Sequence, residues 1–257
     1  MTKEEKNKKT GKEETKLFIP WLKENAKALF WATLIALSIR SFAVEPFNIP
    51  SGSMIPSLLV GDYLFVTKGS YGYSRYSLPF GIPLLPNRLF YSEPKRGDVV
   101  VFKVPYDNST DYIKRVIGLP GDKIQVKEGR LYINDQQVER TFKGRYLTPR
   151  DRTPVEHNLY EEVLPNGIRH DILEYSDNEK QDNTEAFIVP EDHFFMMGDN
   201  RDNSQDSRFE KVGFVPKENL VGKAQIIFYS NNGYSPFIFF WNWGESIRAE
   251  RLFSRIK

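Results

Sequence analysis

A serine that could serve as a nucleophile lies in the segment P-S-G-S-M-I-P-S-L, which spans residues 50–58. Ser53 follows a glycine and stands between two prolines, a composition that predicts a tight, exposed turn. The small residues of such a turn let the backbone of a substrate approach the serine hydroxyl closely. On its own, the pattern is equally typical of a serine-rich turn that only joins two elements.

A lysine that could act as the base for this serine lies in the run D-Y-I-K-R-V-I-G-L-P-G-D, residues 111–122. In an extended strand, alternation places Tyr112, Lys114 and Val116 on one face. Apolar neighbours favour burial of the lysine, and burial lowers the pKa of an amine because desolvation disfavours the ammonium form. A neutral Lys114 amine could then take the proton of a serine hydroxyl. The alternative is an edge-strand lysine whose amine stays in water.

A third polar segment, M-G-D-N-R-D-N-S-Q-D-S-R, covers residues 197–208 and follows an apolar run. Its density of Asp, Asn and Ser predicts a loop that is cross-linked by its own side chains. An ordinary polar loop and a calcium-binding loop are the alternatives. The segment lacks the glycine and terminal glutamate spacing of an EF-hand, so the sequence predicts no metal site here.

The composition limits the other chemistry available to the chain. Its 40% apolar content over 257 residues is enough for a packed core, and the near balance of 36 basic and 34 acidic side chains indicates no nucleic-acid partner. The absence of cysteine excludes disulfides, thiolate metal sites and a cysteine nucleophile. Three histidines, His157, His170 and His193, offer little for a metal site or a Ser-His-Asp triad. A hydrolytic site would therefore use another base.

The segment 28–44 is mostly apolar and predicts a transmembrane helix, at the short end of the roughly 17–25 residues that a bilayer requires. Residues 1–27 form a polar tail and a juxtamembrane stretch whose lysines place the N-terminus in the cytoplasm. Residues 45–257 would then lie outside. The alternatives are a buried core helix interrupted by Arg40 and a cleaved secretory signal that ends at the small-x-small site 41–43.

After residue 44 the chain changes to short β-rich runs separated by turn signals, which favours an antiparallel β fold over alternating β and α units. The predicted strands are Tyr63–Thr67, Asp98–Val104, Tyr112–Ile117, Lys123–Val126, Arg130–Ile133, Ala186–Val189, Phe194–Met197 and Ala224–Tyr229. Residues 136–185 are polar and poor in β-branched runs, which predicts a smaller lobe inserted into the β domain. The aromatic cluster 237–243 is expected either at a membrane interface or at the edge of the core.

Together with R-G-D-V-V-V-F at residues 96–102, these segments resemble type I signal peptidase, the bacterial membrane-bound enzyme that removes signal peptides from exported proteins. The resemblance covers the anchor and four sequence blocks in order, from about Glu45 to Arg208. It implies a mainly β fold, in which one transmembrane α-helix precedes an antiparallel β-sheet catalytic domain with an inserted smaller lobe. It also implies a serine endopeptidase with a Ser-Lys dyad that works through an acyl-enzyme.

The resemblance implies a role for each polar group singled out above. Ser53 is expected to be the nucleophile and Lys114 the general base. The Ser51 hydroxyl and the Ser53 N–H would form the oxyanion hole, which stabilises charge on the tetrahedral intermediate. Ser204 would hydrogen-bond the base and orient it.

Asp206 and Arg208 would brace the polar loop as an ion pair, again by resemblance. Shallow apolar pockets would accept small side chains at the first and third positions before the cut, which gives an A-x-A-like preference. Residues implied to line these pockets are Phe47, Ile49, Pro50, Met54, Leu58, Leu64, Asp111, Tyr112 and Ile113.

The implied partners are pre-proteins that carry signal peptides and the lipid bilayer, with no nucleic acid, and the chain is expected to be a monomer. The implied location is the bacterial cytoplasmic (inner) membrane, crossed once, with the catalytic domain on the extracytoplasmic (periplasmic) side. No metal and no organic cofactor is expected. The small-x-small site also raises the hypothesis that the enzyme cleaves itself after Ala43.

Two other functions fit parts of the same pattern. A self-cleaving repressor shares the Ser-Lys chemistry, but it would carry a DNA-binding helix-turn-helix, and the sequence gives no sign of one. A membrane-anchored β domain could instead bind exported polypeptides without cleaving them. The joint presence of Ser53, Lys114, Ser51 and Ser204 counts against this second alternative.

Overall fold

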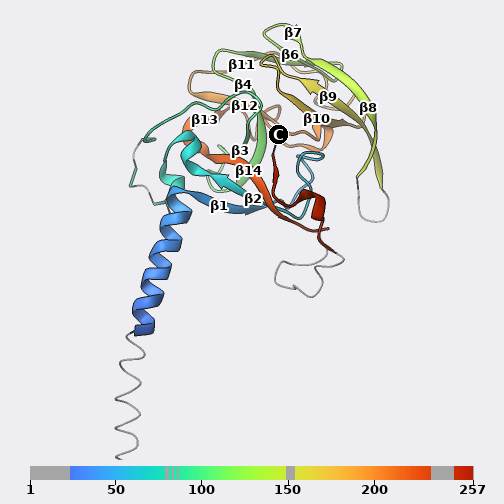
Figure 1. Ribbon diagram of the computed structural model, residues 1–257. Coiled ribbons are helices and arrows are strands. Elements are labelled where there is room, and N and C mark those ends of the chain that lie inside the picture. Colours follow the sequence, from blue (N-terminus) through green and yellow to red (C-terminus); the bar gives the residue numbers. More distant parts are fainter. Residues whose placement is uncertain are drawn as a thin grey trace, which may run out of the picture.

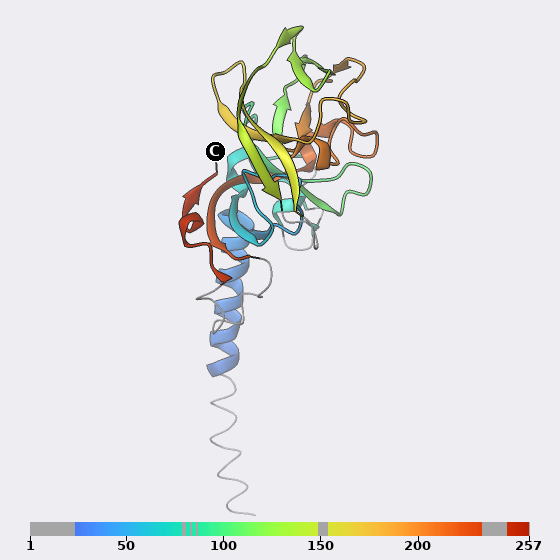
Figure 2. The same ribbon diagram turned by 90° about the vertical axis from the view of Figure 1, so that its right-hand side faces the viewer.

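The computed structural model describes residues 24–78, 81–82, 84–85, 87–148, 154–232 and 246–256. In this part of the chain, one long helix leads into a domain built of β-strands (Figure 1). The helix projects away from the β domain in this view and in the view turned by 90° (Figure 2). The β domain therefore has to form its core without the helix.

The helix covers residues 24–42 and leads almost directly into β1 (Val44–Asn48). Pro46 lies in this strand, and a proline disfavours helical geometry at the residue before it. Phe42 meets the β domain at the junction, where its ring lies edge-on to that of Tyr73 with 5.6 Å between the centroids. The Tyr73 hydroxyl also donates a 2.8 Å hydrogen bond to the Phe42 carbonyl. These contacts fix the end of the helix against the β domain.

Apolar side chains on the helix face outward. Leu29, Phe30 and Trp31 are 69%, 61% and 51% exposed. Within the described residues, no helix has both the length and the apolar character needed to cross a membrane. The structure thus does not show the transmembrane span that the sequence predicts over residues 28–44.

The largest sheet draws strands from both ends of the β domain. Its strands follow the order β1-β2-β14-β3-β4-β12-β13, with β15 paired to β14, and their pairings are antiparallel. The bounds are β2 (Asp62–Thr67), β3 (Val99–Lys103), β4 (Asp111–Gly118), β12 (His193–Met197), β13 (Val215–Pro216), β14 (Leu220–Ser230) and β15 (Ser254–Arg255). The predicted antiparallel, mainly β fold is confirmed.

Two smaller antiparallel sheets lie at the end of the domain farthest from the helix (Figure 1). One has the order β11-β5-β6-β7 and the other β10-β9-β8. Their bounds are β5 (Lys123–Lys127), β6 (Arg130–Ile133), β7 (Gln136–Gln137), β8 (Glu139–Thr148), β9 (Val155–Val163), β10 (Arg169–Glu174) and β11 (Phe187–Ile188). Short 3-10 helices are η1 (Lys68–Tyr71), η2 (Arg75–Ser77), η4 (Arg201–Asn203), η5 (Lys217–Asn219) and η7 (Ala249–Arg251).

The segment of residues 50–58 that contains Ser53 is called the serine turn. The core nearest to it is built from β2, β3 and β14. Buried and half-buried residues alternate along β2, as expected for a strand with one face on a core. Met54, Leu58 and Leu64 are completely buried in the cluster that these strands form. Met54 and Leu58 follow Ser53 closely in the chain, and burying such a side chain contributes about 1.5–3 kcal/mol. The turn is therefore anchored to the core directly behind the serine.

Each strand expected from the sequence overlaps a strand of the structure. The sequence did not predict β8, β9 and β10, which turn the polar segment 136–185 into a sheet of its own. It also missed β1, where the predicted membrane span was carried through to Val44. The aromatic cluster 237–243 and the polar tail 1–16 lie outside the described residues.

Candidate active site

Ser53 and Lys114 meet although the chain separates them widely. Lys114 Nζ donates a 2.6 Å hydrogen bond to Ser53 Oγ and a 3.1 Å hydrogen bond to the carbonyl of Ile113. Lys114 lies on β4, and Ser53 lies in the turn that follows β1. The sheet order separates β1 from β4, so the site forms only when the turn folds back over the sheet.

The environment of Lys114 favours a neutral amine. Its side chain is buried, with the residue only 4% exposed. This burial lowers its pKa from 10.5 to about 8, and the negative charges of Asp206 and Asp199 oppose the change. A lysine with such a pKa has a substantial neutral fraction near physiological pH, and a neutral amine is what a general base requires.

The loop of residues 197–208 holds the serine turn by its backbone. Asn200 N donates to the carbonyl of Ser53 (3.1 Å), and Asn200 Nδ2 donates to the carbonyl of Gly52 (2.9 Å). Gly198 is required where the two segments meet, because a Cβ there would fall 2.5 Å from both Ser53 O and Ser204 Cβ. The loop therefore fixes the serine from the side opposite its anchored apolar residues.

Asp206 and Arg208 cross-link this loop from within. Arg208 Nε and Nη2 each donate a 2.9 Å hydrogen bond to the Asp206 carboxylate, which also accepts from Gly198 N at 3.0 Å. Burial alone would raise the pKa of Asp206, but the Arg208 guanidinium holds it below its ordinary value. The carboxylate therefore stays charged and the loop stays closed around neutral pH.

Ser51 and Ser204 differ in their surroundings. Ser51 is exposed and lines the cleft beside Ser53. Ser204 is buried, and its hydroxyl lies near the Asp206 carboxylate, whose pKa it helps to lower, but it makes no hydrogen bond of good geometry with the described residues. The structure brings Ser204 against the serine turn, but it contains no hydrogen bond from Ser204 to Lys114.

A cleft of about 560 Å³ opens at Ser53 and Lys114. Pocket residues expected from the sequence that line it are Phe47, Ile49, Pro50, Asp111, Tyr112 and Ile113. Met54, Leu58 and Leu64 do not line it, because their side chains are completely buried in the core cluster that also holds Ile49. Pattern alone does not distinguish apolar residues under a cleft from those in its wall.

Several cleft residues were not predicted. They are Asn48, Val101, Thr110, Asn203 and Gln205. Val101 pairs with Ile113 in the β3–β4 ladder, a neighbour that only the strand register reveals. The Tyr112 hydroxyl donates to Gln205 Oε1 at 3.2 Å, which closes the cleft between β4 and the loop. Asn203 and Gln205 flank Ser204, so their positions in the polar loop were the available signal.

Arg115 is a further supporting residue that sequence reasoning missed. It is fully buried, and its Nε and Nη2 donate to the Asp199 carboxylate at 2.8 and 2.7 Å. Its Nη1 and Nη2 also donate to the Gly97 carbonyl (2.8 Å) and to Ser57 Oγ (3.2 Å). Arg115 thus joins β4, the strand that carries Lys114, to the serine turn and to the polar loop. Its position next to Lys114, on the opposite strand face, was the signal in the sequence.

The cleft itself offers no cluster of metal ligands among its described residues. The acidic side chains that lie close enough together to share an ion are those of Glu174, Asp182 and Asp202, and none of them lines the cleft. The chemistry of the cleft therefore has to be argued from its serine, lysine and backbone groups.

Comparison with known proteins gives one consistent result. A family model described as signal peptidase, peptidase S26, matches residues 22–229. A signal peptidase I from Rickettsia typhi is 42% identical, with 91% of this chain and 94% of the relative aligned. A signal peptidase I from Rickettsia conorii is 44% identical, with 86% of this chain and 88% of the relative aligned. The chain therefore belongs to the signal peptidase family, peptidase S26, and is a serine endopeptidase.

Proposed function

We propose that this chain is a membrane-anchored endopeptidase that removes N-terminal signal peptides from exported pre-proteins with a Ser53–Lys114 dyad. The observation that carries the proposal is the 2.6 Å contact between Lys114 Nζ and Ser53 Oγ, made by a buried lysine with a lowered pKa. Family membership supports signal-peptide removal in general. The contact between Ser53 and Lys114 supports the further proposal that these two groups perform the cleavage.

In the proposed mechanism, the neutral Lys114 amine takes the proton of Ser53 as Oγ attacks the scissile carbonyl. The Ser53 N–H and the exposed Ser51 hydroxyl stabilise the oxyanion of the tetrahedral intermediate. The Lys114 ammonium then gives its proton to the leaving amine, which frees the mature protein and leaves an acyl-enzyme on Ser53. Water activated by Lys114 hydrolyses the ester and restores both groups.

Ser204 is proposed to orient the base. Its buried hydroxyl has no well-aligned partner and lies against the serine turn, so it is available to hydrogen-bond the amine when Lys114 loses its proton. Asp206 and Arg208 support this role by holding the loop that carries Ser204. The three residues would act through Lys114 and touch no substrate.

The proposed preference for small-x-small sites rests on the cleft beside Ser53. Its walls combine apolar side chains, among them Phe47, Ile49 and Ile113, with the backbone of the serine turn. The Tyr112–Gln205 hydrogen bond joins two walls of this cleft, and walls held in this way would favour small side chains next to the reacting carbonyl. Small residues at the first and third positions before the cut would fit best.

The proposed anchor rests on the helix over residues 24–42. Its apolar side chains are exposed where the helix leaves the β domain, and lipid tails are one environment that would cover them. Lysines precede the helix in the sequence, so the proposed orientation puts the N-terminus in the cytoplasm and the β domain on the extracytoplasmic side.

The dyad is tested by incubating a pre-protein with the detergent-solubilised chain and measuring the mature product. Ser53→Ala and Lys114→Ala are expected to lower the cleavage rate by at least about 1,000-fold, since each removes a group that acts in bond formation. Ser92→Ala and Lys123→Ala change the same residue types away from the cleft, at an exposed serine and at a lysine whose side chain is 38% exposed, and are expected to retain the wild-type rate. Cleavage by the Lys114→Ala protein at a rate near that of the wild type would refute the proposed base.

A further inference from the structure

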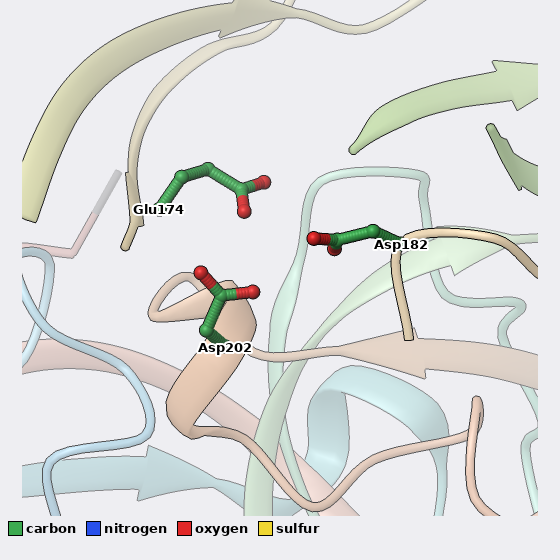
Figure 3. A group of neighbouring side chains, drawn as sticks. All are labelled: Glu174, Asp182 and Asp202. Atoms are coloured by element: carbon green, nitrogen blue, oxygen red, sulfur yellow. The ribbon is translucent and has the colours of Figure 1, made fainter. Parts of the chain in front are cut away.

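Three carboxylates that the proposed mechanism does not use converge where the inserted lobe meets the loop of residues 197–208 (Figure 3). Glu174 ends β10, Asp182 lies in the segment that follows it, and Asp202 belongs to η4. One oxygen of each lies within 4.8 Å of the others, and we call this group the carboxylate triad. Glu174 and Asp182 are only 2% and 1% exposed. Buried acidic groups at such distances require a compensating partner.

Glu174 has only a loose ion pair, with Arg140, among the described residues. Its Oε2 is buried without a hydrogen bond. The nearest cation to its other oxygen is Arg140 Nη1, at 3.6 Å from Oε1, which is beyond hydrogen-bonding distance. The carboxylate points toward those of Asp182 and Asp202 (Figure 3). A buried carboxylate with one oxygen that accepts no hydrogen bond thus faces two further carboxylates.

The two aspartates are held in place by backbone donors. Asp182 Oδ2 accepts a hydrogen bond from Glu179 N (2.5 Å), and Asp202 Oδ2 accepts one from Tyr175 N (2.6 Å). The described residues supply no hydrogen bond to the second oxygen of either carboxylate. Each aspartate is therefore oriented by one oxygen and keeps the other available for a ligand.

The neighbouring arginines are already neutralised by other acids. Arg140 Nη2 donates to both oxygens of Asp177, at 2.9 and 3.1 Å. Arg201 donates one hydrogen bond to each oxygen of the Glu162 carboxylate, one of them at 2.8 Å. The carboxylate triad is thus left with excess negative charge in a largely buried position. Such charge is stable only if a proton or a cation joins it.

We propose that the carboxylate triad binds a hard divalent cation of the size of Ca²⁺. Carboxylate oxygens are the ligands that such ions prefer. Calcium–oxygen distances of about 2.3–2.6 Å allow ligand atoms on opposite sides of the ion to lie about 5 Å apart, which accommodates the observed spacing. Magnesium, at about 2.0–2.1 Å, would require all three oxygens to approach within about 4.2 Å.

This site differs from the EF-hand that the sequence excludes for the polar loop. Only Asp202 comes from that loop, and the other two ligands come from the inserted lobe. A cation there would tie the lobe to the loop next to Asn203, which lines the catalytic cleft. The ion would therefore act on the fold and on loop position, and it would take no part in the bond-breaking steps.

The binding test uses the detergent-solubilised full chain, freed of metal with a chelator and titrated with CaCl₂ or MgCl₂ in a calorimeter. Calcium is expected to bind with one site per chain and more tightly than magnesium. In thermal unfolding, calcium at ten times its Kd is expected to raise the Tm by about 3–6 °C. Both readouts are independent of protease activity.

Matched variants locate the site. Asp182→Asn and Asp202→Asn keep an oxygen for their backbone donors but remove a charge, and each is expected to abolish the calcium-dependent rise in Tm. Asp171→Asn removes a half-buried charge from the same lobe, where it pairs with Lys143 at 2.7 Å, and should respond to calcium as the wild type does.

The proposal fails if the wild-type chain shows neither calcium-binding heat nor a calcium-dependent rise in Tm. It fails equally if Asp182→Asn and Asp202→Asn keep the wild-type calcium response. A shared proton in place of the ion would appear as an Asp182→Asn protein that is more stable than the wild type, with no effect of calcium on either. If the variants do not fold, the wild-type titration alone decides.

Discussion

Burial of Lys114 lowers the pKa of its amine, which favours a general base, and it also reduces the stability of the folded chain. In water an amine of this kind has a pKa of 10.5, and burial lowers the value to about 8 in the folded chain. Because the folded state holds its proton less tightly than the unfolded state, stability contributed by this residue rises with pH between about 8 and 10.5. Below pH 8 the burial of the ammonium destabilises the fold by its full amount.

The first prediction follows from this increase of stability with pH. At pH 7, Lys114→Met is expected to raise the free energy of unfolding by roughly 2–3 kcal/mol while it abolishes cleavage, because the apolar side chain avoids the desolvation of a charge. The gain should shrink as the pH rises from 8 toward 10.5. Urea unfolding at pH 7 and pH 10 measures both effects, with Lys123→Met as the exposed control. A less stable variant at pH 7 would contradict the assigned environment.

The second prediction concerns how the rate of cleavage depends on pH. If the neutral amine of Lys114 is the base, kcat/KM is expected to rise about tenfold per pH unit below pH 8 and to level off above it. The measurement is initial rates of cleavage between pH 5.5 and 9.5, with a peptide substrate that carries no group titrating in that range. A profile that is flat between pH 6 and 8 would mean that Lys114 does not carry the proton.

At the scale of elements, β4 carries the proposed base, Lys114, on one face and a structural cation, Arg115, on the other. Arg115 on this strand pairs with Asp199 in the polar loop and contacts Ser57 in the serine turn. Both partners of the pair are almost completely buried, at 0% and 1% side-chain exposure. Removing one partner of such a pair leaves the other charge buried without a counter-charge.

The third prediction is the effect of breaking this link. Asp199→Asn is expected to lower the free energy of unfolding by about 3–5 kcal/mol, since Arg115 would stay buried without its counter-charge. Chemical denaturation of the detergent-solubilised chain measures the loss. Asp135→Asn breaks an exposed pair with Lys123 and should leave the stability unchanged. Equal stability of the two variants would mean that the buried pair does not tie β4 to the loop.

Local patterns were enough to predict the strands that carry the site. A β-rich run bounded by turn residues identified β4, and alternation assigned the face that holds Lys114. The strands β8, β9 and β10 were missed because charged and polar residues interrupt their apolar positions, although only β8 is largely exposed and β10 is mostly buried. The link from Arg115 to Asp199 could not be predicted, since it depends on how strands far apart in sequence are paired. The burial of Met54, Leu58 and Leu64 in the core could not be predicted for the same reason, since it too depends on how distant strands pack.

At the scale of the whole molecule, the helix and the β domain present different surfaces. The β domain buries its apolar side chains, whereas the helix exposes Leu29, Phe30 and Trp31. These exposed side chains would associate in water, so the helix needs a partner or a membrane to cover them.

The fourth prediction tests the proposed anchor. In bacteria that express the chain, it is expected to stay with the membrane fraction after extraction at pH 11, because a membrane-spanning segment is not released by breaking ionic contacts. Protease added to spheroplasts should digest the β domain and spare an N-terminal fragment. Release into the soluble fraction would contradict the anchor, and a β domain that is digested only after lysis would contradict the orientation.

The Asn200 bonds to the serine turn carry a consequence for how the chain matures. The bond from Asn200 to Gly52 joins groups 148 residues apart in sequence, and Ser53 and Lys114 lie 61 apart. Closing such distant contacts is slow, and it happens late compared with local hairpins. A newly made chain therefore cannot complete its candidate site before the loop of residues 197–208 has been made and has folded against the serine turn. The order of synthesis thus sets the earliest time at which Ser53 and Lys114 can be held in place.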